Sequence, residues 1–216
     1  MGDLFREIDE EMRQERFEKL WQSYGKYAMG IGVVLVLAVV AWKSWDHYIV
    51  SQRQEQSLQF SNANKLLAEG KKTEAAARFA SLAQEGSGGY KTLARFHQAA
   101  LRADSGDKAG ALSIYDALAK DASIDWTMRE AADIFAVTLG LDDATADFGT
   151  FNTRLAPLMA DGGAWRHAAR ELAGLIALRQ SDSKLAREHF QKIADDPAAP
   201  QGMRARAVQI LAVVSQ

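Results

Sequence analysis

The side chains best suited to chemistry in this 216-residue chain are four histidines, and their spacing matches no metal site. They are His47, His97, His167 and His189. His167 and Glu171 lie four positions apart, which would place them on one face of a helix, but no second histidine completes a ligand set. We therefore interpret this pair as a solvated helix pair rather than as metal ligands.

Two further segments resemble ligand-binding loops only superficially. Asp142, Asp143 and Asp147 carry oxygen ligands that calcium prefers, but the segment lacks the loop glycine and closing glutamate of an EF-hand, so helix N-capping better explains Asp142. The glycine-rich segment 86–89 is expected between two helices rather than after a strand, which favours a plain loop over a phosphate cradle. The chain has no cysteine and no serine in a nucleophile elbow. We expect no enzymatic activity, no catalytic residue, no cofactor and no metal ion.

One arrangement of polar side chains remains, and it is a stripe of cations at helical spacing. The stripe consists of Lys91, Arg95, Gln98 and Arg102, and the theme returns at Arg166 and Arg170. A guanidinium fork can hold a carboxylate or backbone carbonyls at two points. The alternative is an ordinary solvated helix face. In either case we expect these side chains to be accessible, so that replacing them changes stability by less than about 0.5 kcal/mol.

The elements that position these residues are predicted to be helices throughout. The chain is 48% hydrophobic and 25% charged, which is typical of a folded protein, and its net charge of −2 gives no footprint for nucleic acid. Only three prolines occur, and no stretch alternates with period two. We therefore predict an all-α protein.

Three segments of the chain share a pattern, which predicts repeated helix pairs. Each has a turn residue, then an alanine five positions on, an aromatic residue four positions later and an aliphatic residue three after that. On a helix these last three residues share one face. The sets are Gly70, Ala75, Phe79 and Leu82; Gly106, Ala111, Tyr115 and Leu118; and Ser181, Ala186, Phe190 and Ile193. We expect the three aromatic rings to be buried between neighbouring helices.

The distances between the copies indicate a missing unit. The first two copies are 36 residues apart and the next two are 75 apart, close to two periods. Tyr90, Trp126 and Trp165, which begin the following helices, are separated by 36 and 39 residues. We therefore expect a degenerate unit at about 126–160 and a repeat domain over 61–216.

A separate apolar segment near the start predicts a transmembrane helix over 26–45. From Tyr27 to Trp42 no residue is charged and eight are Val, Leu or Ile. Aromatic residues flank this run, and from Tyr24 to Trp45 a helix rises roughly 32 Å, enough to cross a bilayer. We expect a helical N-terminal tail over 1–25 and a linker helix over 46–60. A cleaved signal peptide and a buried core helix are the two alternatives.

The orientation of this span follows from the cations beside it. The preceding side carries Arg13, Arg16, Lys19 and Lys26, whereas the following side carries Lys43 and Arg53. Because positive charge is retained in the cytoplasm, we expect the tail there and the repeat domain outside.

The repeated pattern resembles the tetratricopeptide (TPR) repeat. Gly106, Asp107 and Ala111 match the G-D-x-x-x-A start of its second helix, and small residues fall where its first helix needs them, at Ala63, Ala99 and Gly174. The Trp-Leu pattern of the first helix is absent, and so is the closing proline except near Pro197 and Pro200. The resemblance implies an α-solenoid for binding proteins, in which the stripe of Lys91, Arg95, Gln98, Arg102, Arg166 and Arg170 would line the partner-binding groove.

The full architecture is similar to that of the YfgM-like single-pass proteins of the bacterial inner membrane, ancillary subunits of the Sec translocon. That resemblance implies a periplasmic interaction module that assists exported proteins. Its partners would be translocon components, periplasmic chaperones or emerging chains, with one span in the bilayer and no nucleic acid. The alternative function is a self-associating, homo-oligomeric envelope scaffold or division coordinator without a translocon role.

Overall fold

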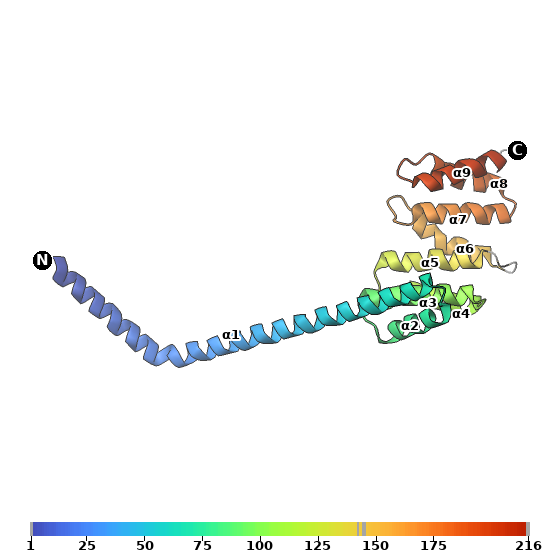
Figure 1. The fold of residues 1–216 in the computed structure, drawn as a ribbon. Helices are drawn as coiled ribbons and strands as arrows, with labels where there is room; N and C mark the ends of the chain where they lie inside the picture. Colours follow the sequence, from blue (N-terminus) through green and yellow to red (C-terminus); the bar gives the residue numbers. More distant parts are fainter. Residues whose placement is uncertain (1, 142, 144–145, 215–216) are drawn as a thin grey trace. The chain divides into compact units, whose positions relative to one another are not determined.

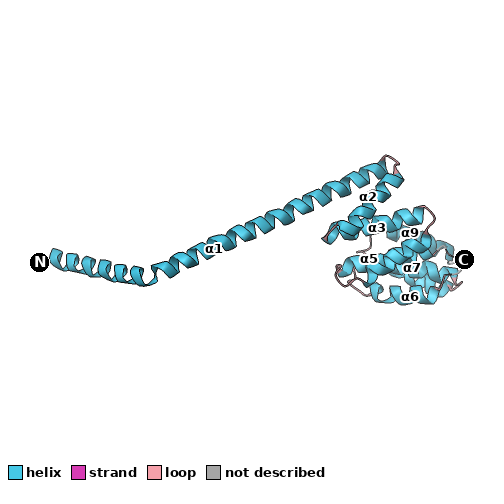
Figure 2. Ribbon diagram, turned by 90° about the horizontal axis from the view of Figure 1, so that it is seen from below, coloured by secondary structure: helices cyan, strands magenta, loops and turns pink. Residues whose placement is uncertain are grey.

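Helices make up all the regular structure that the computed structural model describes (Figures 1 and 2). The described residues are 2–141, 143 and 146–214, without the side chains of residues 2–25, 28, 32 and 33. The elements are α1 (Gly2–Ala68), α2 (Lys72–Glu85), α3 (Gly88–Asp104), α4 (Lys108–Lys120), α5 (Trp126–Gly140), α6 (Phe148–Leu155), the 3₁₀ helix η1 (Ala156–Met159), α7 (Arg166–Arg179), α8 (Ser183–Ala194) and α9 (Gln201–Val214). The all-α prediction is confirmed.

The chain forms two compact units, Met1–Glu55 and Gln56–Gln216, so the division lies within α1 and within the expected linker 46–60. In the first unit the backbone of residues 2–25 is helical. The segment Met29–Ala68 contains a window apolar enough to cross a membrane, with mean hydropathy 1.5, and none of that window is buried. Leu37, for example, is 62% exposed. The alternative of a buried core helix is therefore wrong.

The second unit consists of successive helix pairs. Residues 56–68 of α1 pair with α2, α3 with α4, α5 with α6 and α7 with α8, and α9 packs on α8. In Figure 1, α5, α7 and α9 follow one another along the stack. Gln56, which is only 7% exposed, fastens the first pair to the next, because its side chain accepts a hydrogen bond from the Ser87 amide at 3.1 Å.

The three turn residues of the repeated pattern adopt the same backbone conformation. Gly70, Gly106 and Ser181 have positive φ angles of 77°, 92° and 62°. In each case the next amide donates to the carbonyl five residues earlier, the capping bond that ends a helix at a left-handed residue. These bonds join Lys71 to Leu66, Asp107 to Arg102 and Asp182 to Ala177, each at 2.9 Å. The repeats inferred from the sequence are therefore repeats in the structure.

The three repeated rings form the centre of the core, as expected. Phe79 and Phe190 are fully buried and Tyr115 is 5% exposed. The alanines that precede them, Ala75, Ala111 and Ala186, are all fully buried. Phe79 also stacks on His97, with ring centroids 4.4 Å apart and planes inclined by 4°.

Gly174 provides the close approach between α7 and α8. A Cβ atom built at this position would lie 2.8 Å from two carbon atoms of the Phe190 ring, closer than real Cβ contacts allow. Phe190 itself has no exposed surface to which its ring could retreat. The small residue predicted for this position is therefore required by the ring beside it.

The degenerate unit occupies the expected region, with a short second helix. Asp147 caps α6, since its carboxylate accepts hydrogen bonds from the amides of Gly149 and Thr150. The α-helix ends at Leu155 and passes directly into η1, where Pro157 has no amide hydrogen with which to continue the α-helical bonding. Asp147 is thus a capping residue, whereas Asp142 lies outside the described residues.

The helix α5 borders two separate parts of the core. Ala132 and Ala136 belong to a cluster with Tyr115 on the side of α4. Ile134 and Val137 belong to a second cluster, formed with α6, η1 and α7. One face of α5 thus packs alanines against α4, and the other packs larger aliphatic side chains against α6, η1 and α7, so that this helix connects the earlier and later helix pairs of the second unit.

Candidate functional site

The cationic stripe of α3 is divided between two cavities. Lys91 and Arg95 line a cavity of about 650 Å³ together with the loop between α4 and α5. Gln98 and Arg102 line a different cavity of about 460 Å³, against the alanine-rich face of α2. Arg166 and Arg170 are not among the residues that line either one. The helical spacing suggested that these six side chains line one groove, but in the structure they do not line a common cavity.

Two arginines of the stripe form ion pairs within the chain. The guanidinium of Arg95 lies 3.0 Å from a carboxylate oxygen of Asp121, in the loop before α5, and Arg102 lies 3.3 Å from Asp107. Hydrogen bonds from Ser123, together with the one from Arg95, hold the pKa of Asp121 below its usual range. Asp121 therefore stays charged and keeps Arg95 engaged.

Arg166 and Arg170 are also engaged, and Arg170 is buried. Arg166 lies 3.4 Å from Asp196. Arg170 donates to the Met159 carbonyl at 3.1 Å and to Asp161 at 2.7 Å, and it is only 9% exposed. The expectation that all six side chains are freely accessible is wrong for Arg170, because this residue fastens the loop after η1 to α7 and its replacement would disturb the fold.

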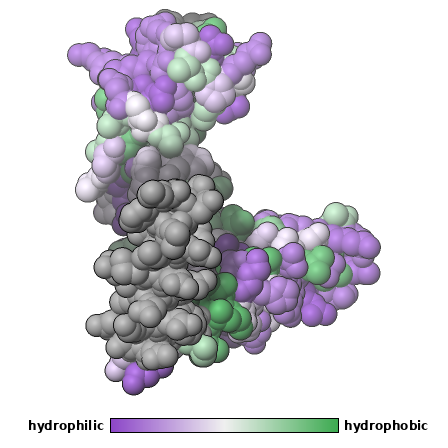
Figure 3. All heavy atoms as spheres, turned by 90° about the vertical axis from the view of Figure 1, so that its left-hand side faces the viewer, coloured by the Kyte–Doolittle hydropathy of each residue, from purple (hydrophilic) through white to green (hydrophobic). Residues whose placement is uncertain are grey.

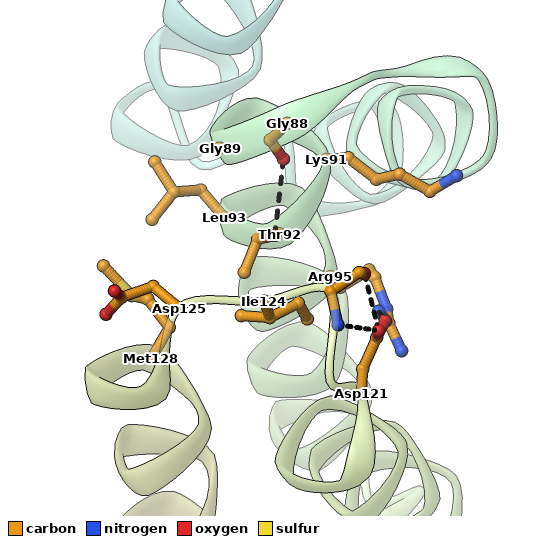
Figure 4. Close-up of a pocket in the computed structure, with 11 residues that line it drawn as sticks. Gly88, Gly89, Lys91, Thr92, Leu93, Arg95, Asp121, Ile124, Asp125 and Met128 are labelled. Carbon is orange, nitrogen blue, oxygen red and sulfur yellow. Dashed lines mark hydrogen bonds and ion pairs between the residues drawn. The ribbon is translucent and has the colours of Figure 1, made fainter.

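The cavity beside Lys91 combines apolar and polar walls (Figure 4). Leu93 and Met128 lie on one side in this view, Ile124 lies in the middle, and Lys91 and the Arg95–Asp121 pair lie on the other side. Of the glycine-rich segment 86–89, which was predicted to be a loop, only Gly86 and Ser87 connect α2 and α3. Gly88 and Gly89 are the first residues of α3 and line the cavity. Lys91 reaches past this segment to the Gln84 carbonyl at 3.3 Å.

The apolar wall of this cavity was missed in the sequence. Leu93 and Met128 are 36% and 41% exposed, although aliphatic residues within a helical repeat would ordinarily be assigned to the core. Leu93 directly precedes Ala94, which is fully buried. The position of Leu93 beside this buried alanine in the helical register of α3 is the sequence signal that could have placed Leu93 outside the core. The Asp121 partner of Arg95 lies 26 residues away and no local pattern connects them.

Three of the four histidines, His97, His167 and His189, lie in the second unit, whereas His47 is exposed on α1. His167 is only 7% exposed, and its Nε2 atom lies 3.6 Å from an oxygen of Asp196, while Glu171 pairs with Arg206 of α9 at 2.9 Å. The interpretation of His167 and Glu171 as a solvated pair is therefore wrong. In the part of the chain that the structure describes, no group of three potential metal-binding side chains comes together.

Burial of the histidines predicts a stability that falls on acidification. Desolvation lowers the pKa of His97, His167 and His189. The unfolded chain therefore binds protons more readily than the folded chain. The contribution of the buried, neutral histidines to stability is fully present above the unfolded pKa of about 6.5 and is lost as the pH falls below it. The melting temperature of the full chain in detergent should be lower at about pH 5.5 than at about pH 7.5. Replacing all three residues by glutamine should reduce that difference, and an unchanged difference would contradict the assignment.

One family model of known proteins matches most of the chain. The family described as tetratricopeptide repeat-like domain matches residues 18–211. Searches of curated proteins and of solved structures found no match. The matched range covers the helix pairs described above and also includes the apolar segment of α1.

Proposed function

The chain belongs to the tetratricopeptide repeat-like family, and from this premise we propose that it is a membrane-anchored module that binds other proteins. Domains of this kind are scaffolds that present stacked helix pairs to partners. One observation carries the proposal. An apolar helix segment without buried side chains precedes a helical repeat unit that has its own core, so the two parts are suited to different surroundings.

The finer assignment is to the Sec translocon of a bacterial inner membrane. The resemblance to YfgM-like proteins supports this assignment, because the chain has the same order of N-terminal tail, single span and degenerate repeats as these proteins. In this role the repeat unit lies in the periplasm, and its partners are translocon components, chaperones or chains emerging from the channel. The chain would act there by binding rather than by catalysis.

A second candidate function is a self-associating envelope scaffold. It is favoured by α9, on which Val208 and Val213 are 56% and 73% exposed. Apolar side chains on a terminal helix of a repeat array expose surface that a neighbouring molecule can cover.

Crosslinking of the intact protein in native membranes, followed by identification of the partners, distinguishes the two functions. Translocon components should be crosslinked to the chain under the first proposal, and an unrelated single-span protein of the same membrane serves as the control. Crosslinks confined to copies of the chain itself, lost in Val208→Ser and Val213→Ser variants, would replace the translocon assignment by the scaffold.

The proposed topology predicts which part of the chain a protease reaches. Protease added to spheroplasts should digest the chain beyond about residue 50 and leave the N-terminal tail intact, because the cations preceding the span are retained in the cytoplasm. Opening the spheroplasts should then expose the tail, which is the control for protease activity. Digestion of the tail in closed spheroplasts would reverse the orientation, and a soluble product beginning near Lys43 would identify a cleaved signal peptide.

A further inference from the structure

We propose that the cavity between α3 and the α4–α5 loop binds an extended segment of a partner protein in which an aliphatic side chain and a carboxylate follow each other closely. This inference rests on the proposed protein-binding function and names the chemistry of the partner. We call the cavity the α3–α5 pocket, and its lining includes Leu93, Ile124, Met128, Lys91, Asp125 and the Arg95–Asp121 pair.

The apolar side of the α3–α5 pocket is suited to an aliphatic side chain. Leu93 extends from α3 and Met128 from α5, and both lie on the same side of the cavity, with Ile124 between the helices (Figure 4). More than a third of Leu93 and of Met128 is exposed in the free protein. Covering such surface contributes roughly 25 cal/mol per Å² of apolar area removed from water.

The opposite side of the α3–α5 pocket favours a negative charge. Among the described residues no carboxylate lies within ion-pair distance of Lys91, whose ammonium group donates only to the Gln84 carbonyl. The first turn of α3 contains no acidic residue, and Ser87 makes no side-chain capping bond there. Lys91 therefore lies beside the uncompensated positive end of a helix, where a carboxylate of the partner is stabilised.

The carboxylates already present at the pocket oppose this charge only weakly. Asp121 is paired with Arg95. Asp125 caps α5, and hydrogen bonds from the Thr127 hydroxyl and amide hold its pKa below the usual range. It lies on the side of Met128 and away from Lys91 (Figure 4). A segment that fills both sides of the pocket therefore needs an apolar side chain and an acidic side chain close to each other.

The size of the cavity fits a short segment rather than a folded domain. Its volume of about 650 Å³ lies within the range of about 300–1,000 Å³ that is common for ligand pockets. A surface of this size accommodates only a few residues, so the affinity of one such segment should be low. Among the atoms that are coloured in Figure 3, hydrophilic side chains predominate and hydrophobic ones form small groups.

The test uses the full chain in detergent and a fluorescent peptide with one leucine followed by one glutamate in a glycine–serine frame. Leu93→Ser should weaken binding about tenfold, because it removes most of one aliphatic contact. Lys91→Glu should weaken binding about fivefold, and the loss should shrink at high salt. The matched controls are Leu185→Ser and Lys184→Glu on α8, since Leu185 is also 36% exposed and Lys184 is an exposed cation. Both should bind like the unchanged protein.

A charge exchange makes the test specific. A peptide with lysine in place of glutamate should bind weakly to the unchanged protein and better to the Lys91→Glu variant. All variants should melt like the unchanged protein, because the replaced side chains are not part of the core. Binding of the peptide that is indifferent to Leu93→Ser and Lys91→Glu overturns the inference.

Other outcomes separate this inference from the proposed function. Translocon crosslinks in membranes without binding of the leucine–glutamate peptide would overturn the pocket assignment and leave the function in place. Absence of protein crosslinks altogether would overturn the function. Self-association that is lost with Leu93→Ser would show that the pocket is occupied by a second copy of the chain, and would overturn the assignment to a partner segment.

Discussion

Phe190→Ala and Phe79→Ala should each lower the free energy of unfolding by about 3–5 kcal/mol, the range for removing a fully buried aromatic ring. Both rings have no exposed surface. Phe190 lies against Gly174 of α7, and Phe79 belongs to the core cluster that contains the buried Ala63 and Ala94. Removal of Phe79 also takes away the ring on which His97 stacks. Urea denaturation of the full chain in detergent measures the change.

The neighbours of these rings provide the controls. Arg78 and Gln191 each lie one residue from a repeated ring and are exposed. Their replacement by alanine should change the free energy of unfolding by less than about 0.5 kcal/mol. Equal losses at the buried and exposed positions would contradict the repeat register. Because a repeat array can depart from two-state unfolding, the slope of the transition should be compared between variants before energies are derived.

Gly174→Ala should destabilise the repeat unit by about 1–3 kcal/mol, although glycine to alanine in a helix interior ordinarily stabilises by about 1 kcal/mol. The new methyl group would meet the buried Phe190 ring at 2.8 Å. Either α7 must move away from α8 or the ring must leave its position, and both lose contacts. The melting temperature and the urea midpoint should fall together.

Two comparisons show whether the ring is the cause. Gly202, in α9, has only the end of the Arg206 side chain near a built Cβ atom, at 3.8 Å, so Gly202→Ala should cause no loss. In a Phe190→Leu background the smaller side chain frees space, and the further cost of Gly174→Ala should nearly vanish, a coupling that a double-mutant cycle measures. Additive losses would place the strain elsewhere.

The positions of the helix pairs were largely predictable because the core pattern is local. The intervals between turn residue, alanine and ring are set by the helix period, so a single sequence contains them. The turn at Ser181 was predicted from its place in the pattern, and the structure adds that Ser181 has the same positive φ angle as Gly70 and Gly106. The short α6 is a different case, because Pro157 and the residues after Asp147 give no periodic pattern from which its length follows.

The candidate site was less predictable because its contacts are distant in sequence. The spacing of Arg95 and Arg170 gave both the same expected role, yet Arg95 pairs with Asp121 at the rim of a cavity and Arg170 is buried against Met159 and Asp161. His167 is buried for a similar reason, since Asp196 comes from the loop after α8. Helical periodicity places a side chain on a face, but the loops of other units decide what covers that face.

The two-sided packing of α5 has a consequence for cooperativity. In a linear array, the energy that holds each element comes from its nearest neighbours, and folding spreads from one to the next through shared interfaces. Since Ala132 and Ala136 face one cluster and Ile134 and Val137 the other, α5 transmits that coupling between the first helix pairs and the last ones. A loss of order within α5 would let the array unfold in two separate blocks, so this one helix sets the length over which the repeat unit behaves as a single cooperative whole.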